Sequence, residues 1–559
     1  MKRITILLSA TVLVLLAVGA VLPTPAVLAQ TPQLATPTGL ENAAKEFVTL
    51  LSQGQIEQAA QSFDPTLVKP ETNAQIQQAW DGLIKQMGVF QKISETVQTR
   101  ELNLDMVYVT TDFAQGSVDI RIVFNQAGQV AGMQFFPAGT GKAAAQPYKT
   151  APYVKPGSFT EQQVVVGGPE FPLPGILTIP TGAGPFPAVA LVHGSGPNDR
   201  DETIFTNKPF RDLAEGLSSQ GIAVLRYDKR TKVYGQQMNE DPAGITVKEE
   251  VTDDALSAIE LLHKTPSIDP QRIFLLGHSL GGMLAPRIAE QAQATPDAGL
   301  TGAIIMAGPT RPLADLMIEQ MTYLFQLNGT ITPEQQAQLD QYKQQAAKVK
   351  DPNLAADTPR DQLLFGASAA YWLDLRNYSP AQTAAKLSIP LFILRGERDY
   401  QVAQADFDGW KAVLGDKPGV VYKQYPSLNH LFISGTGQPN PQEYQVPSHV
   451  SEQVVNDIAN FIKTGKVSQN LPLIGSLSLQ EITRLVLLLL PLLLIQLGLS
   501  IYALVDLIRR KKTHGPRWLW AVLLVLTLFA LPTGLIVAGV YLFWGRKEED
   551  GDDGDDDSD

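Results

Sequence analysis

The segment Gly277-His278-Ser279-Leu280-Gly281 places a serine between two glycines. A continuous apolar run, IFLL, precedes this segment, and a helical stretch, MLAPRIAEQAQ, follows it. A sharp turn from a strand into a helix projects a serine above a sheet, where its hydroxyl can attack an acyl carbonyl. The sequence therefore predicts that Ser279 is a nucleophile and that the N–H of Leu280 faces the developing oxyanion.

A serine hydroxyl is a weak nucleophile and needs a neighbouring base. The chain has six histidines, and His430, in the segment YPSLNHLF, directly follows a strand-like run, GVVYKQYP. The base of this arrangement lies on a loop after the last strand, so His430 is the predicted base. The other histidines have different expected places: His193 at a strand exit, His263 at the end of a surface helix, His278 on the turn beside Ser279, His449 as a cap or surface group of the final helix, and His514 in a basic loop.

Two carboxylates follow the apolar run IPLFILRG, which precedes the His430 strand. The acid that orients the histidine belongs at the end of this preceding strand. Asp399 is the better candidate because the extra residues after the strand let its loop turn toward the histidine. Glu397 beside Arg398 instead fits a solvated ion pair. Ser279, Asp399 and His430 thus occur in the order nucleophile, acid, histidine.

The loop after the run FPAVALVHG contains Gly194, Ser195 and Gly196. Glycines let backbone N–H groups approach a ligand closely, so either Ser195 or Gly196 is expected to donate the second hydrogen bond to the oxyanion. Ser195 as an alternative nucleophile is disfavoured, because no elbow-type helix turn follows it. The next segment, NDRDE, alternates carboxylates with arginine and fits a paired or solvated loop better than a metal site, so no metal and no cofactor are predicted.

Six apolar runs alternate with amphipathic stretches between residues 158 and 465, namely FPAVALVHG, GIAVLRYD, QRIFLLG, TGAIIMAG, IPLFILRG and GVVYKQYP. Continuous apolar runs are expected for parallel strands that helices cover on both faces, so the predicted class is α/β. One helix is expected from the capping-box pattern at Thr246 to Glu249. The insertion at about 311–387 is too long for a connection and is predicted to be a helical cap. Four cap aromatics are expected either in its core or along an apolar pocket: Tyr323, Phe325, Tyr371 and Trp372.

Residues 40–137 are predicted to form a separate small α+β module. Helical spacing in ENAAKEFVTLLSQGQIEQAAQSF gives way to strand-like alternation in VDIRIVFNQAGQVAGMQFFP. Linkers rich in Pro, Thr, Ala and Gly flank the module at 30–39 and 138–157. The module is therefore expected to fold apart from the α/β region at 158–465.

Both ends of the chain carry membrane-related patterns. Residues 1–29 combine two basic residues with a long apolar run and end in small residues, which is typical of a secretory signal cleaved after Ala29. An uncleaved anchor is the alternative, because the apolar run is long for a signal. Residues 485–508 and 518–544 are each apolar and long enough to cross a bilayer as helices. The basic loop at 509–517 predicts a cytoplasmic turn between them, with the α/β region on the outer side of the cell membrane.

The composition excludes several function classes. The 559-residue chain contains no cysteine, which removes thiol catalysis, thiolate metal sites and disulfides. The formal net charge of -12 comes largely from the acidic tail at 546–559, in which EEDGDDGDDDSD alone carries nine negative charges. The remainder is nearly balanced, so no nucleic-acid partner is predicted.

The motifs HGSGPNDRDE, GHSLGG, RGERDYQV and LNHLF resemble a family of bacterial α/β-hydrolase carboxylesterases across residues 158–465. The resemblance implies an α/β-hydrolase fold with a helical cap over the site, and it implies the same three residues, Ser279, Asp399 and His430. The module at 40–137 resembles a cone-like domain of unknown function that often precedes such hydrolases. The C-terminal hairpin resembles the two-helix membrane segment at the start of phospholipase D and cardiolipin-synthase-like proteins, but the chain has no HxK motif for phosphodiester chemistry.

These patterns together predict a serine carboxylesterase that cleaves short or medium acyl esters of small molecules through an acyl-enzyme. The same residues would serve a peptidase or an acyltransferase, which is the nearest rival. In a rival of another class, the chain is a cell-surface binding protein whose module at 40–137 recognises a cell-envelope ligand.

Overall fold

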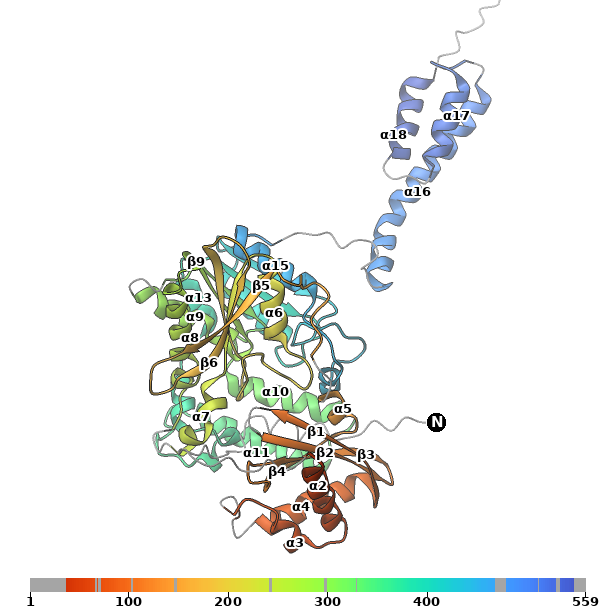
Figure 1. Ribbon diagram of the computed structural model, residues 1–559. Helices are drawn as coiled ribbons and strands as arrows, with labels where there is room; N and C mark the ends of the chain where they lie inside the picture. Colours follow the sequence, from red (N-terminus) through yellow and green to blue (C-terminus); the bar gives the residue numbers. More distant parts are fainter. Residues whose placement is uncertain are drawn as a thin grey trace, which may run out of the picture. The chain divides into compact units, whose positions relative to one another are not determined.

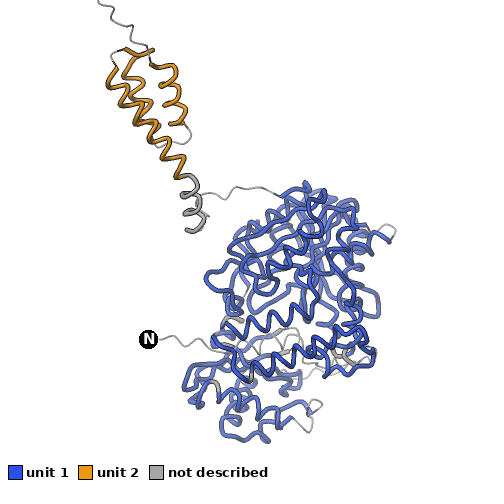
Figure 2. Tube along the Cα trace, turned by 180° about the vertical axis from the view of Figure 1, so that it is seen from behind, with its two compact units in different colours: residues 1–467 blue, residues 468–559 orange. Residues whose placement is uncertain are grey.

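The computed structural model divides the chain into two compact units, Met1–Val467 and Ser468–Asp559 (Figure 2). It describes residues 37–546 except 66–67, 69–71, 102–103, 145–147, 241–243, 296–298, 328, 468–478, 511 and 529–532. The predicted signal at 1–29 and the acidic residues after Arg546 lie outside the described residues.

An eight-stranded sheet forms the centre of the first unit, in the order β12-β11-β10-β9-β7-β8-β6-β5 (Figure 1). All six predicted strands are present and pair in parallel: β7 Phe186–Val192, β8 Ala223–Tyr227, β9 Ile268–His278, β10 Gly302–Met306, β11 Leu391–Gly396 and β12 Val420–Tyr425. Two further strands, β5 Phe159–Val166 and β6 Leu173–Pro180, pair antiparallel at one edge. β5 was not among the predicted strands, because this edge strand is largely exposed and has the sequence FTEQQVVV rather than a continuous apolar run.

Helices cover both faces of the sheet, as expected for parallel strands. One face carries α6 Pro209–Ser218 and α15 Glu452–Thr464, whose apolar side chains pack on Phe274 and Phe392. The other face carries α8 Asp253–His263, α9 Leu280–Ala294, α13 Pro380–Lys386 and α14 Gln404–Leu414. The carboxyl ends of the parallel strands share one edge of the sheet, where their loops can form a site.

The predicted helix after Thr246 begins with the expected capping contacts, because Glu249 accepts hydrogen bonds from the Thr246 N–H and hydroxyl. Its first turn, η1 Lys248–Thr252, is a π-turn that leads into α8. The preceding helix, α7 Arg230–Glu240, is kinked at Tyr234. The regular α-helix α8 therefore begins at Asp253, later than the capping pattern at Thr246 to Glu249 suggested.

The insertion after β10 forms helices α10 Leu313–Gln326, α11 Pro333–Lys350 and α12 Ala369–Leu375, with 3-10 turns η2 Arg360–Gln362 and η3 Leu364–Gly366. The predicted cap limit at 387 differs from the structure, because α13 packs on α9 and belongs to the helical layer of the sheet. Phe325 is buried with Tyr400 and Leu431 between the cap and the strand ends. Trp372 is buried in the main core, and the ring of Tyr323 stacks on that of Tyr400 while Tyr371 packs beside Trp372.

The N-terminal module is a four-stranded antiparallel sheet, β1 Phe90–Glu101, β2 Leu104–Phe113, β3 Gly116–Phe124 and β4 Val130–Pro137. Helices α2 Pro37–Ser52, α3 Ile56–Ala60 and α4 Thr72–Met87 supply the rest of its own core, which includes Phe47, Trp80 and Phe113. The predicted linker at 138–157 contains α5 Thr140–Ala144, which packs on β1 and β2. Further along this segment the Tyr148 hydroxyl donates to Asp212, so it is anchored to the α/β domain.

The C-terminal unit contains α16 Leu479–Arg509, α17 Arg517–Leu526, α18 Thr533–Val540 and the π-turn η6 Tyr541–Gly545. Within α16, Leu490–Arg509 is long and apolar enough to cross a membrane. The predicted second span at 518–544 is not one helix, because α17 and α18 are separate. Gln496 of α16 donates to the carbonyl oxygens of Thr527 and Leu528, so a polar side chain contacts backbone groups that the end of α17 leaves without helical partners.

Candidate functional site

Ser279 lies between β9 and α9 with φ of 54° and ψ of -115°. A positive φ is uncommon for a residue with a side chain and is the strained conformation that a nucleophile elbow requires. Glycines permit the close approach of helix and strand. A Cβ at Gly277 would lie 2.1 Å from the Gly281 carbonyl oxygen, and a Cβ at Gly281 would lie 2.3 Å from the Val192 carbonyl oxygen.

His430 and Asp399 form a buried hydrogen bond of 2.7 Å between Nδ1 and Oδ2. The other carboxylate oxygen of Asp399 accepts from the N–H groups of Gln401 (2.8 Å) and Val402 (2.9 Å), which fixes its orientation. Asp399 follows β11 and His430 follows β12, so both lie at the carboxyl ends of the strands, where Ser279 follows β9. The structure therefore brings the predicted acid and base together beside the elbow.

Glu397, the other predicted acid, is exposed and takes no part in this pair. The expected ion pair between Glu397 and Arg398 is wrong, because Arg398 pairs with Glu443 of the 3-10 turn η4 Pro441–Gln445. Arg398 also donates to the carbonyl oxygen of Thr436. These contacts tie the loop that contains Asp399 to the segment that follows His430.

Gly194 lies directly against the elbow, because a Cβ at this position would be 3.1 Å from the Ser279 Cβ. Its N–H donates to Glu202 Oε1 at 2.7 Å. Its carbonyl oxygen accepts from Lys229 Nζ at 2.9 Å and from Asn198 Nδ2 at 3.2 Å. The N–H of Gly194 is thus occupied, and the orientation of the next peptide group is set by two side chains.

These contacts orient the predicted oxyanion donors. In a trans peptide the N–H points away from the preceding carbonyl oxygen, so the Ser195 N–H points away from Lys229 and Asn198. Asn198 Nδ2 also donates to the Ser195 carbonyl oxygen at 3.1 Å, which fixes the following peptide of Gly196. Across the described ranges no backbone hydrogen bond uses the N–H of Ser195, Gly196 or Leu280.

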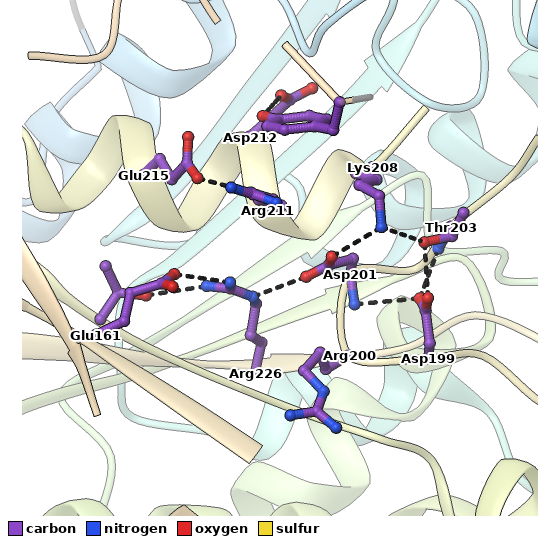
Figure 3. Close-up of polar contacts among 12 residues, drawn as sticks. Glu161, Asp199, Arg200, Asp201, Thr203, Lys208, Arg211, Asp212, Glu215 and Arg226 are labelled. Atoms are coloured by element: carbon purple, nitrogen blue, oxygen red, sulfur yellow. Dashed lines mark hydrogen bonds and ion pairs between the residues drawn. The ribbon is translucent and has the colours of Figure 1, made fainter. Parts of the chain in front are cut away.

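The NDRDE segment is held by ion pairs (Figure 3). Asp201 accepts from Arg226 Nε at 2.9 Å and from Lys208 Nζ at 3.0 Å, and Arg226 is only 2% exposed. Arg200 donates to both carboxylate oxygens of Asp228. In the part of the chain that the structure describes, no group of three or more histidine, aspartate or glutamate side chains could hold a metal ion. The cations and carboxylates of this segment instead fix the loop that contains Gly194.

Sequence reasoning missed the partner of His278. Its Nδ1 lies 2.9 Å from Glu202 Oε2, and its Nε2 lies 3.0 Å from the His430 carbonyl oxygen. Burial disfavours both charges, but the attraction between them outweighs it, which raises the pKa of His278 and lowers the pKa of Glu202. The two residues are 76 positions apart, so no local spacing could have revealed the pair.

Two other histidines have structural partners. His193 is 1% exposed and packs against the rings of Phe210 and Tyr227, and burial lowers its pKa to about 4. His449 was expected as a cap or surface group, but its Nδ1 lies 2.9 Å from the buried carboxylate of Asp212. The hydrogen bond to Asp212 raises the pKa of His449.

Esterase EstD of Thermotoga maritima is 38% identical to this chain over 396 residues, which are 71% of this chain and 89% of EstD. The chain belongs to the α/β-hydrolase esterases. It is a serine esterase, and its substrate is a small-molecule ester, as the sequence predicted. A family model described as serine aminopeptidase, S33, matches residues 188–437 of this esterase. A model described as a protein of unknown function (DUF3887) matches residues 44–133, which confirms the N-terminal module.

Further similarities cover smaller shares of the esterase or have low structural overlap. Negative regulatory protein YxlE of Bacillus subtilis is 42% identical over 61 residues, which are 11% of this chain and 86% of YxlE. The esterase of Pyrobaculum calidifontis has a TM-score of 0.35 and 15% identity, with 59% of this chain and 89% of that chain covered. The acylaminoacyl peptidase of Pyrococcus horikoshii has a TM-score of 0.37 and 13% identity, with 68% of this chain and 58% of that chain covered. The family assignment rests on EstD and on the order of the strands.

Proposed function

We propose that this esterase hydrolyses carboxylic esters through an acyl-enzyme on Ser279. His430 takes the hydroxyl proton as Oγ attacks the ester carbonyl, and it gives the proton to the departing alkoxide, which leaves as the alcohol. Water then attacks the acyl-enzyme, His430 takes its proton and returns it to Ser279 Oγ, and the acid is released. The buried 2.7 Å hydrogen bond from His430 Nδ1 to Asp399 carries the proposal, because a proton on Nδ1 leaves Nε2 as the base.

The oxyanion donors in this proposal are the N–H groups of Leu280 and Ser195. Leu280 is the first residue of α9, so its N–H has no partner within the helix. Ser195 is favoured over Gly196 because the peptide of Ser195 begins at Gly194, which lies against Ser279. Two N–H groups at this point would stabilise the charge of the tetrahedral intermediate.

Short or medium acyl groups are the proposed substrates, and no cofactor enters the reaction. The apolar cluster of the cap includes Phe325, Tyr400 and Leu431. Tyr400 follows Asp399 and Leu431 follows His430, so the cluster borders the proposed acid and base. An apolar acyl chain would gain free energy by contact with such a surface.

Hydrolysis of p-nitrophenyl acetate and butyrate tests the proposal. Ser279→Ala should lower kcat at least about 10⁴-fold and should abolish labelling by a fluorophosphonate probe. Ser257→Ala is the matched control, because its hydroxyl donates to the Asp253 carbonyl oxygen within α8. Normal turnover in Ser279→Ala would overturn the assignment.

Peptide hydrolysis is a second candidate, because the matching family model is described as a serine aminopeptidase. The same groups can attack an amide or pass the acyl group to an acceptor other than water. Aminoacyl p-nitroanilides, assayed beside the esters with and without added alcohol, separate these activities. We expect kcat/KM for esters to exceed that for anilides at least about 100-fold, since the amide is the more difficult substrate.

We further propose that residues 485–544 anchor the enzyme in the cell membrane, with the esterase domain on the extracytoplasmic side. The apolar helix Leu490–Arg509 and the basic residues Arg509, Arg510 and Arg517 around the following turn support this topology. Protease added to intact spheroplasts should then digest the domain while activity sediments with membranes. Digestion only after lysis would contradict the topology.

The module at 40–137 is proposed to recognise a cell-envelope ligand. It has a hydrophobic core of its own, and apart from the contact of Phe136 with Phe205 the cores of the α/β domain do not include its residues. Native enzyme should sediment with purified cell-wall material, and a chain without the module should not, while both hydrolyse p-nitrophenyl acetate at similar rates. Equal sedimentation of the two chains would contradict a recognition role.

A further inference from the structure

A buried histidine and a buried glutamate lie beneath the proposed site and have no role in the proposed reaction. His278 Nδ1 is 2.9 Å from Glu202 Oε2, and both side chains are at most 3% exposed. His278 immediately precedes Ser279, so its ring is attached to the elbow itself.

Both outer hydrogen bonds of this pair end on main-chain atoms. Glu202 Oε1 accepts from the Gly194 N–H at 2.7 Å, and His278 Nε2 lies 3.0 Å from the His430 carbonyl oxygen. A continuous chain of hydrogen bonds therefore runs from Gly194 through Glu202 and His278 to His430. It joins the loops after β7, β9 and β12, which contain the proposed oxyanion donor, nucleophile and base.

The acceptors fix the number of protons on the pair. A carbonyl oxygen only accepts, so His278 Nε2 carries a hydrogen and donates it to His430. A second proton must lie between His278 Nδ1 and Glu202 Oε2, because two bare acceptors would not approach to 2.9 Å. The pair is therefore neutral as a whole, and it acts through its directional hydrogen bonds.

The backbone of Glu202 has an unfavourable conformation. Its φ is 50°, in the left-handed region that residues with a side chain seldom occupy, and Ser279 has φ of 54°. Such conformations persist only where the surroundings hold them. Asp201, one residue earlier, pairs with the side chain of Arg226, whereas Glu202 binds the main chain beside Ser279.

We propose that Glu202 and His278 act as a positioning pair, which fixes the oxyanion peptide at Gly194–Ser195 and the base His430 relative to Ser279. The inference rests on the proposed function, because that function gives these three positions their roles. Neither side chain of the pair touches the reacting atoms.

Two replacements of Glu202 separate geometry from charge. In Glu202→Gln the amide can donate to Nδ1 of a neutral His278 while its oxygen accepts from Gly194, so every hydrogen bond of the chain is retained. Glu202→Ala removes both bonds. We expect Glu202→Ala to lower kcat for p-nitrophenyl acetate at least about 30-fold with KM changed less than about threefold, and Glu202→Gln to lie within about fivefold of the native enzyme.

A thionoester substrate reports on the oxyanion site itself. Sulfur accepts weaker hydrogen bonds than oxygen does, so the native enzyme should prefer p-nitrophenyl acetate over its thiono analogue. Glu202→Ala should lose at least about tenfold of this preference, because a displaced donor no longer distinguishes the two atoms. A purely structural role would reduce the amount of folded enzyme without changing the ratio.

Asp212→Ala is the matched control, because Asp212 is another buried carboxylate that binds a histidine, His449, and a main-chain N–H, that of Val450. It should lower Tm and leave kcat per folded enzyme and the oxygen-to-sulfur preference unchanged. Native kcat in Glu202→Ala, or equal damage in Glu202→Gln and Glu202→Ala, would overturn the positioning pair. Normal turnover and fluorophosphonate labelling of Ser279→Ala would instead overturn the proposed function. In that case the loss of activity in Glu202→Ala would need a cause other than the positioning of Ser279, Ser195 and His430.

Discussion

Two segments border the proposed site and are held by opposite means. The loop at 193–208, which we call the oxyanion loop, is fixed by buried ionic groups: Glu202 binds the N–H of Gly194 and Lys229 binds its carbonyl oxygen. The cap helices α10 and α11 contact the same region through apolar side chains, including Phe325.

An esterase must place its oxyanion donors accurately and must also accept particular acyl groups, and the two kinds of contact suit these two requirements. Hydrogen bonds from charged groups are directional, so they fix the positions of backbone atoms to within a fraction of an ångström. Apolar packing is not directional and tolerates changes of shape at a modest cost. The oxyanion loop should therefore set the rate of reaction, whereas the cap should set which acyl groups are accepted.

The largest expected effect is that of Gly194→Ala in the oxyanion loop. The new Cβ would lie 3.1 Å from the Ser279 Cβ and 3.3 Å from Glu202 Oε1, so the loop must shift away from the elbow. We expect kcat for p-nitrophenyl acetate to fall at least about 100-fold, which is the usual cost of losing one oxyanion donor. Gly235→Ala is the control, because nothing lies within 4 Å of its added Cβ. Near-native kcat in Gly194→Ala would contradict a rigid oxyanion loop.

Lys229→Met should affect both activity and stability. The change removes a donor to the Gly194 carbonyl oxygen and leaves Glu250 buried without its cation, which lies at 2.7 Å. Breaking a buried pair costs about 3–5 kcal/mol of the free energy of unfolding. We also expect kcat to fall about tenfold or more, because the peptide that precedes the Ser195 N–H loses an anchor.

The double variant Lys229→Met/Glu250→Gln distinguishes the two effects of Lys229. It removes the uncompensated carboxylate, so chemical denaturation should show a partial recovery of stability. The Gly194 carbonyl oxygen still lacks its donor, so kcat should stay low. Recovery of kcat together with stability would show that Lys229 acts only on folding.

The sequence predicted most of the sheet and the positions of the acid and base. Six strands were found from continuous apolar runs, because parallel strands are buried on both faces. The two antiparallel strands did not meet this criterion, because the edge strand β5 is largely exposed and the sequence of β6, LPGILTIP, is interrupted by proline and glycine. Asp399 was chosen over Glu397 from the length of its loop, and its contact with His430 in the structure agrees with this choice.

What the sequence could not predict were contacts between distant side chains. The pairing of His278 with Glu202 depends on the tertiary contact between the loops after β7 and β9, and the periodicity of the sequence does not predict such a contact. Arg398 was assigned to its neighbour Glu397 but reaches Glu443 across the strand ends. The division of the second apolar segment into α17 and α18 was also missed, although its sequence contains Leu531-Pro532-Thr533-Gly534, and proline and glycine disfavour a continuous helix.

Phe325→Ala tests the cap side of the comparison. Phe325 is 3% exposed, and truncation of such a ring costs about 3–5 kcal/mol of the free energy of unfolding. We nevertheless expect kcat for p-nitrophenyl acetate to change less than about threefold, while the preference among longer acyl chains shifts, because the space left lies beside Tyr400 and Leu431. Phe461→Ala, in the helical layer of α6 and α15 and outside the cap cluster, should lose similar stability without altering chain-length preference. An unchanged preference in Phe325→Ala would remove the cap from substrate selection.

The smallest expected effect concerns pH, to which ionic anchoring should respond and apolar packing should not. His449 gains its hydrogen bond to Asp212 in the folded state, and this bond raises the pKa of His449 above the usual histidine value of about 6.5. A group with a raised folded pKa contributes its full stability below the unfolded pKa and loses it as pH rises through the folded value. Between pH 6 and pH 8.5 we expect Tm of the native enzyme to fall by about 1–2 °C more than that of His449→Gln, since a partly exposed pair contributes little. Phe325→Ala should keep the pH slope of the native enzyme, and loss of that slope in Phe325→Ala would show that the cap and the ionic contacts are not independent.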